Sequence, residues 1–196
     1  MADFLTISSP SEGIYKEKGS KFIAYAYPVI SEDEVRTYVK ALKKEYYDAR
    51  HHCYAFVLGK DKIKFRAADD GEPSNSAGAP ILGQLRSLEL TNVLVVVVRY
   101  FGGTKLGVPG LIDAYREAAK DALSQAQIIG EFEQTIFDIQ FEYIKMNDVM
   151  KIVKDAKLKV VKQQFDNNCE MTLQCNTSDA DQPLHQLREM NVLLED

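Results

Sequence analysis

A basic, glycine-rich segment between a predicted buried strand and a predicted helix has the clearest capacity for chemistry in this chain. The stretch VVVVRYFGGTKLGVPGLIDAYREAA covers residues 95–119. Arg99 and Lys105 are cationic donors, and the glycines Gly102, Gly103 and Gly107 let the backbone turn and approach a ligand closely. The helix after them would offer N–H groups and a dipole that favour an anion. The segment predicts a phosphate site, for an RNA backbone or a phosphorylated small molecule; the alternative is a tight turn with a solvated lysine.

Two aromatic residues stand at the mouth of the same segment. Tyr100 and Phe101 follow the predicted strand directly, where a ring can stack on a base or pack against the protein. The segment lacks the Gly-Lys-Ser/Thr of a Walker A loop and the G-x-G-x-x-G of a dinucleotide fingerprint. It therefore predicts an anion site without identifying a nucleotide-binding fold.

The loop DDGEPSNSAG, residues 69–78, carries three carboxylates, on Asp69, Asp70 and Glu72. Carboxylate oxygens are ligands that suit Mg²⁺, but Asp and Ser before a helix are also typical caps. We favour the capping and turn interpretation. A further alternative is that Asp70 or Glu72 pairs with Arg99 and holds the basic loop rigid.

The run HHC, residues 51–53, contains groups that bind metals or act as nucleophiles. In a strand His51 and Cys53 share one face while His52 points to the other, which leaves too few ligands for zinc. We predict no metal, no cofactor and no identifiable catalytic residue, and we place His51 on a binding face. The three cysteines are expected to be reduced.

Hydrophobic periodicity and turn residues predict the elements of a first segment. A capping box of Ser31 and Glu34 opens the first helix. The helix after the basic loop should bury Leu111, Ala114, Tyr115, Ala118 and Leu123. The expected elements are a strand at 21–29, a helix at 31–46, a hairpin of 51–59 with 62–68, a helix at 79–90, a strand at 92–100 and a helix at 109–126.

The pattern restarts after residue 130, so we predict two domains, 1–130 and 131–196. Strands at 134–143, 158–165 and 169–175, with a turn at 166–168, alternate with helices at 145–156 and 178–190. Ser178 or Asp179 would cap the last helix. This order is that of a ferredoxin-like α+β sandwich, whose final strand would have to come from Val192–Asp196.

Charge is uneven along the 196 residues, whose net charge is −5. Residues 1–130 contain 17 basic and 16 acidic side chains, a net of +1, whereas residues 131–196 contain 7 and 13, a net of −6. Indiscriminate nucleic-acid binding is unfavourable for an acidic protein, but a local basic site in the first domain is compatible with these numbers. The sequence shows no leader and no membrane span, and we predict a cytoplasmic protein.

Four stretches of the first domain resemble the YigZ/IMPACT family. They are KGSKFIAYA from Lys18, YYDARHHCYAFVLG from Tyr46, DDGEPSNSAGAPIL from Asp69, and the opening stretch from Val95. The R-Y-F-G-G-x-K-L-G block and D-G-E-P-S are specific to this family. The chain departs from the family pattern at Pro109 and Asp113, where glycine and arginine are expected, and Asp113 weakens a nucleic-acid contact there.

The resemblance implies an N-terminal domain with the fold of ribosomal protein S5 domain 2 and a ferredoxin-like C-terminal domain similar to elongation factor G domain V. It also implies a role in translation regulation. We therefore predict a translation-associated protein that contacts RNA or the ribosome through the basic loop. We favour a binding protein over an enzyme. The alternatives are an enzyme or binding protein for a phosphorylated small molecule, and an adaptor whose acidic C-terminal domain binds a protein partner.

Overall fold

A computed structural model describes residues 2–165 and 168–195 of the chain. The chain divides into two compact units, Met1–Glu131 and Phe132–Asp196, one residue from the predicted domain boundary. Both units mix helices with strands, in agreement with the predicted α+β class. Each unit is described below by itself.

Unit 1 is built on an antiparallel five-stranded sheet in the order β2-β3-β6-β4-β5. Its central strand, β6, contains the run Val95–Val98, which is fully buried, as the run of valines predicted. Burial is complete because helices cover both faces of the sheet. The strands are β2 (Ser11–Glu17), β3 (Ser20–Pro28), β4 (His51–Leu58), β5 (Lys64–Ala68) and β6 (Val93–Tyr100).

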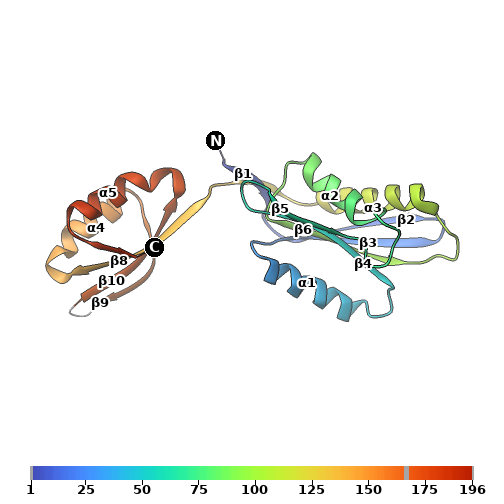
Figure 1. Cartoon of the computed structure of the whole chain (residues 1–196), viewed down its shortest axis with the longest axis horizontal. Helices are drawn as coiled ribbons and strands as arrows, with labels where there is room; N and C mark the ends of the chain where they lie inside the picture. Colours follow the sequence, from blue (N-terminus) through green and yellow to red (C-terminus); the bar gives the residue numbers. More distant parts are fainter. Residues whose placement is uncertain (1, 166–167, 196) are drawn as a thin grey trace. The chain divides into compact units, whose positions relative to one another are not determined.

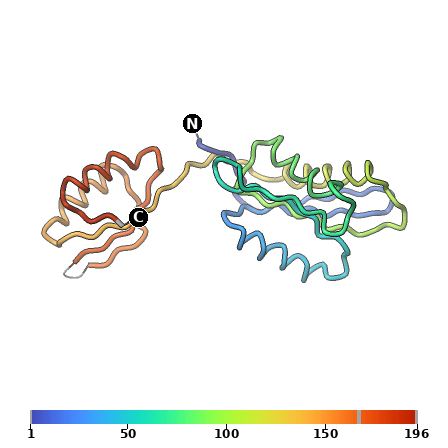
Figure 2. Tube along the Cα trace, viewed as in Figure 1, coloured from blue at the N-terminus to red at the C-terminus, as the bar shows by residue number. Residues whose placement is uncertain are grey.

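Three helices form the outer layers of unit 1, as Figures 1 and 2 show: α1 (Glu32–Glu45) on one face, α2 (Gly78–Ser87) and α3 (Gly107–Ser124) on the other. Ser31 caps α1 by accepting from the Glu34 N–H. The Glu34 carboxylate accepts from Ile30, one residue before the position that the capping box predicted. All five residues predicted for the buried face of α3 are buried.

A two-stranded sheet of β1 (Phe4–Ile7) and β7 (Ile128–Glu131) joins the start of unit 1 to its end. Neither strand was expected from the sequence, nor was β2. β1 and β7 have four residues each, too few to show a clear alternation. They are held by pairing between segments about 120 residues apart.

Unit 2 is an antiparallel four-stranded sheet in the order β11-β8-β10-β9, with helices α4 and α5 on one face. Its elements are β8 (Gln134–Glu142), η1 (Tyr143–Lys145), α4 (Met146–Asp155), β9 (Lys159–Phe165), β10 (Asn168–Asn176), η2 (Thr177–Asp179), α5 (Asp181–Glu189) and β11 (Leu193–Glu195). The short last strand is therefore present. The turn predicted at 166–168 includes residues 166–167, which lie outside the described residues.

The expectations about the last helix cap, the cysteines and membrane spans can also be compared with the structure. The predicted cap of the last helix is wrong: η2 occupies Thr177–Asp179, and the cap position is Ala180, without a side-chain hydrogen bond. Cys53, Cys169 and Cys175 are all free and buried, as predicted. Among the described residues, no helix combines the length and apolar character needed to cross a membrane.

Candidate nucleic-acid interface

The glycine-rich loop packs against the neighbouring β2–β3 turn. A Cβ added to Gly102 would lie 1.9 Å from the carbonyl carbon of Gly19, and the Gly102 N–H donates to the Ser20 Oγ at 3.1 Å. Gly103 and Gly107 have φ values of +89° and +72°, a region that glycine adopts without strain. The glycines thus serve the turn, and at Gly102 the close approach is to the protein itself.

Arg99, predicted as an anion-binding group, is buried in an ion pair. Its Nη1 lies 2.6 Å from Glu72 Oε1, and the two side chains are only 8% and 4% exposed. Its guanidinium also lies 5.5 Å from the ring centroid of Phe22 and 5.8 Å from that of Phe101. Of the alternatives that the sequence left open, the structure contains the Glu72–Arg99 pair. Arg99 and Glu72 are therefore positioning residues for the loop rather than ligand contacts.

The Glu72 carboxylate also connects the loop to α3. The Tyr115 hydroxyl donates to Glu72 Oε1 at 2.7 Å, and the Cys53 thiol donates to the Tyr115 oxygen at 3.3 Å. Burial is the main reason why the pKa values of Cys53 and Tyr115 are raised. Cys53 is therefore a protonated packing residue, not a thiolate nucleophile.

Asp69 caps the start of α2 from eight residues away. Its carboxylate accepts from the N–H groups of Asn75, Ala77 and Gly78 at 2.8, 3.1 and 2.8 Å. The N–H groups of Ala77 and Gly78 belong to the helix start, which leaves such donors without intrahelical partners, and that of Asn75 belongs to the preceding turn. The capping interpretation of the acidic loop thus describes Asp69.

Asp70 also accepts hydrogen bonds from neighbouring groups of the protein. Its carboxylate accepts from the His52 N–H at 2.7 Å and from Lys43 Nζ at 2.8 Å. Burial alone would raise the pKa of Asp70, but these donors lower it below its ordinary value. His51 Nδ1 lies 2.9 Å from the Asp70 carbonyl oxygen. Within the described ranges, no three acidic, His or Cys side chains are arranged to hold a metal, so the Mg²⁺ alternative finds no geometric support.

Four lysines belong to the loop and to the β2–β3 hairpin that packs against it. We call Lys16, Lys18, Lys21 and Lys105 the lysine surface. Lys16 lies directly opposite Lys21 across β2 and β3, a like-charge pair that destabilises a sheet. Lys18 is in the turn, and Lys105 follows Gly102 by three residues. In the part of the chain that the structure describes, none of the four forms an ion pair.

Two further features border the lysine surface. Phe101 is 56% exposed, whereas the Tyr100 hydroxyl donates to Asp48 at 2.7 Å, a bond that together with burial raises the pKa of Tyr100 to about 12. The first turn of α3 has neither an acidic residue nor a side-chain cap, and a helix start favours an anion, although Pro109 contributes no N–H. Phe101 is thus the ring available for stacking, and Tyr100 is anchored.

The two departures from the family pattern leave this surface intact. Pro109 lies in the first turn of α3, where a missing N–H costs no intrahelical bond. Asp113 lies a turn and a half into the helix and pairs with Arg116 Nη1 at 2.7 Å. Its charge is therefore balanced by a neighbour on its own helix.

Sequence reasoning selected Lys105 but missed Lys16, Lys18 and Lys21. The signal available was the sequence KEKGSK, residues 16–21, in which basic residues flank a glycine turn. The segment before it, SEGIYKE, is largely polar and did not suggest a strand, so its lysines could not be placed beside the loop.

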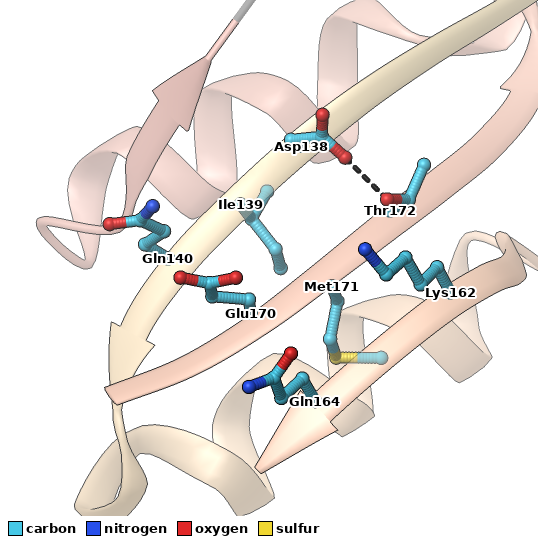
Figure 3. A pocket seen from close by; sticks show the side chains of 8 residues that line it. All are labelled: Asp138, Ile139, Gln140, Lys162, Gln164, Glu170, Met171 and Thr172. Carbon is cyan, nitrogen blue, oxygen red and sulfur yellow. Dashed lines mark hydrogen bonds between the residues drawn. The ribbon is translucent and has the colours of Figure 1, made fainter. Parts of the chain in front are cut away.

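Unit 2 offers a different kind of surface. A shallow cavity of about 130 Å³ lies on the sheet of unit 2, and Figure 3 shows the side chains of β8, β9 and β10 that line it. Thr172 donates to Asp138 there, with Lys162 and Glu170 nearby. This mixture of charges does not resemble the lysine surface.

The fold and the site together define a two-unit α/β protein with a cationic, aromatic-bordered surface at one end of its first sheet. The chain matches the Impact N-terminal domain over residues 18–123. It is 33% identical to an IMPACT family member of Haemophilus influenzae over 88% of this chain and 85% of that protein. It is 30% identical to the IMPACT family member YigZ of Escherichia coli, over 84% and 82%. The chain belongs to the IMPACT family.

One solved structure agrees with this chain at the level of the fold. A crystal structure of a hypothetical protein covers 99% of this chain and 97% of its own, with a TM-score of 0.77 and 27% identity. The two-domain translational regulator Yih1 is 25% identical over 62% of this chain and 47% of its own, with a TM-score of 0.36.

Proposed function

We propose that this IMPACT family protein is a translation-associated binding protein whose lysine surface contacts structured RNA, on the ribosome or free. The observation that carries the proposal is that four lysines, on the loop and on the adjoining β2–β3 hairpin, form no ion pair within the described residues. Keeping Lys16 and Lys21 opposite each other costs stability, and a phosphate backbone would offset that cost. Phe101 and the start of α3 add a stacking face and backbone donors.

The surface suits a local contact rather than general attraction to nucleic acid. The protein carries a net charge of −5, so long-range attraction is weak and the short-range lysines must supply the affinity. Each lysine that neutralises a phosphate contributes close to one unit to the salt dependence of binding. The role of Arg99, Glu72, Asp70 and His51 in this proposal is to hold the loop in place.

We also infer the two finer fold assignments. For unit 2, the order β8–α4–β9–β10–α5–β11 in one antiparallel sheet supports a ferredoxin-like fold. For unit 1, support for a fold like ribosomal protein S5 domain 2 comes from the resemblance of residues 18–119 to the YigZ/IMPACT family. Yih1 is described as a translational regulator. For this chain, a role in translation is a proposal that rests on family membership and the lysine surface.

A small-molecule enzyme is the weaker candidate. Asp70 and Glu72, which would have to hold its metal, are already hydrogen-bonded to protein donors. No residue is therefore proposed as catalytic. The protein partner predicted for the acidic second segment stays a separate proposal.

Co-sedimentation with ribosomes tests the proposed function. One variant replaces all four residues of the lysine surface with glutamine. A control variant removes four exposed lysines elsewhere, namely Lys44, Lys120, Lys151 and Lys154. Both lose the same net charge, so the proposal predicts that only the first leaves the ribosome pellet. Equal loss in both variants, or equal retention, would contradict it.

A further inference from the structure

The strand β5 is an edge of the five-stranded sheet and is exposed over residues 64–67, whereas Gly78 packs against its last residues. The sheet order ends at β5, and in the described residues no other strand pairs with its outer side. Lys64, Phe65, Arg66 and Ala67 are all exposed. An edge of this kind presents backbone donors and acceptors that can pair with another extended segment.

The two faces of β5 differ in chemistry. On the α1 face lie Lys64 and Arg66, opposite Leu58 and Phe56 of β4. On the α2 face, Phe65 is 48% exposed beneath the Arg86 guanidinium, which lies 4.4 Å from the ring centroid. Ile63, just before the strand, is 75% exposed. The alternation is thus cationic on one face and apolar on the other.

The cationic face forms one wall of a groove between α1 and the β4–β5 edge, with a volume of about 390 Å³. The groove is lined by the cationic side chains of Arg36, Lys40, Lys43 and Arg66, and one carboxylate, that of Asp70. Lys43 is paired with Asp70, and Arg36 with Asp33. Among the described residues, Lys40 and Arg66 form no ion pair, and they face the groove.

We propose that β5 binds an extended acidic segment of a partner protein by strand addition. Backbone hydrogen bonds along the edge would supply affinity, and alternate side chains would supply specificity. Because side chains alternate across a strand, a segment with acidic residues at every second position would place them against Arg66 and Lys40. The intervening apolar residues would then lie beside Phe65 and Ile63. This inference is independent of the lysine surface.

The competing explanation is that the charges on β5 only protect the edge, since lysines on edge strands discourage pairing. Protection predicts that the edge rejects every added strand. Strand addition predicts that it accepts one whose charges are opposite. The two explanations therefore make opposite predictions for the binding of an acidic peptide to β5.

A peptide of about eight residues, long enough to span β5, provides the probe. It alternates Glu with Val and Thr and carries a fluorescent label, and binding to the full-length protein is followed by anisotropy. One control replaces its Glu residues with Lys, and another N-methylates alternate residues to block backbone pairing. The proposal predicts that the first peptide binds and that each control binds at least about tenfold more weakly than the first peptide.

Protein variants complete the test. Lys64→Glu with Arg66→Glu should weaken peptide binding about tenfold and leave ribosome co-sedimentation unchanged. Lys151→Glu with Lys154→Glu, on exposed α4 positions, should leave both unchanged. If the acidic peptide does not bind, or binds equally well when N-methylated, the strand-addition proposal is overturned.

Discussion

Replacing Glu72 with glutamine should destabilise unit 1 strongly, because it leaves a buried cation without its counter-charge. Arg99 and Glu72 are 8% and 4% exposed, with Arg99 Nη1 2.6 Å from Glu72 Oε1, and no described residue accepts a hydrogen bond from the buried Arg99 Nε. Removing one partner of a buried ion pair costs about 3–5 kcal/mol. Glutamine keeps a side-chain oxygen that accepts from the Tyr115 hydroxyl. We therefore expect a loss of unfolding free energy at the lower end of this range, about 3 kcal/mol.

Native-state hydrogen exchange measures this cost within unit 1. The amides of Val95–Val98 lie in the fully buried centre of β6 and exchange through the largest openings. A loss of about 3 kcal/mol should speed their exchange more than a hundredfold, since each tenfold step is about 1.4 kcal/mol. Glu117→Gln, which breaks an exposed 3.9 Å pair with Lys120, is the matched control and should cost under about 0.5 kcal/mol.

A double variant separates the ion pair from general disruption. Glu72→Leu combined with Arg99→Met removes both charges, and such replacements are often neutral. The double variant should therefore be more stable than Glu72→Gln alone, a clear departure from additivity. The reasoning is refuted if Glu72→Gln costs less than about 1 kcal/mol, or if the double variant is the least stable of the set.

Three further outcomes are expected. Gly102→Ala should lower both the stability of unit 1 and its RNA binding, because the new methyl group would meet the backbone of Gly19; thermal unfolding and ribosome co-sedimentation measure the two effects. Asp69→Ala should cost about 2 kcal/mol in urea unfolding, at the upper end for a helix cap, because three N–H groups lose their acceptor. Burial lowers the pKa of His52 below 6.5 despite the nearby Asp70 carboxylate. The unfolded chain therefore binds that proton first, and stability should fall as pH drops below about 6.5. His52→Phe should remove that loss in a pH series of unfolding curves. The lowered pKa of Asp70 gives a separate loss at more acidic pH, around and below its ordinary value of 3.8.

The sequence predicted the elements whose signal is local. The valine run of β6 and the apolar stripe of α3 depend on periods of a few residues, and both occur where expected. β1 and β7 were missed because they are short and pair with each other across about 120 residues, and β2, which pairs with the next strand, was missed because it is largely polar. Their existence depends on tertiary contacts rather than on intrinsic pattern.

The candidate site was harder to predict for the same reason. Arg99 had an anion, Asp70 or Glu72 as possible partners, and only the path of the acidic loop selects Glu72. Lys16 and Lys21 are brought opposite each other by the β2–β3 register, and Gly102 fixes the loop beside them. The approach of Gly102 to Gly19, unlike the hairpin register, cannot be deduced from spacing along the chain.

The salt dependence of RNA binding tests the central claim most directly. Binding of a structured ribosomal RNA fragment is measured by anisotropy between about 50 and 200 mM salt, for the protein and for the variant without the lysine surface. If all four lysines contact phosphates, the slope of log affinity against log salt should be flatter in the variant by about three to four. Equal slopes for the two proteins would contradict an RNA contact through these lysines.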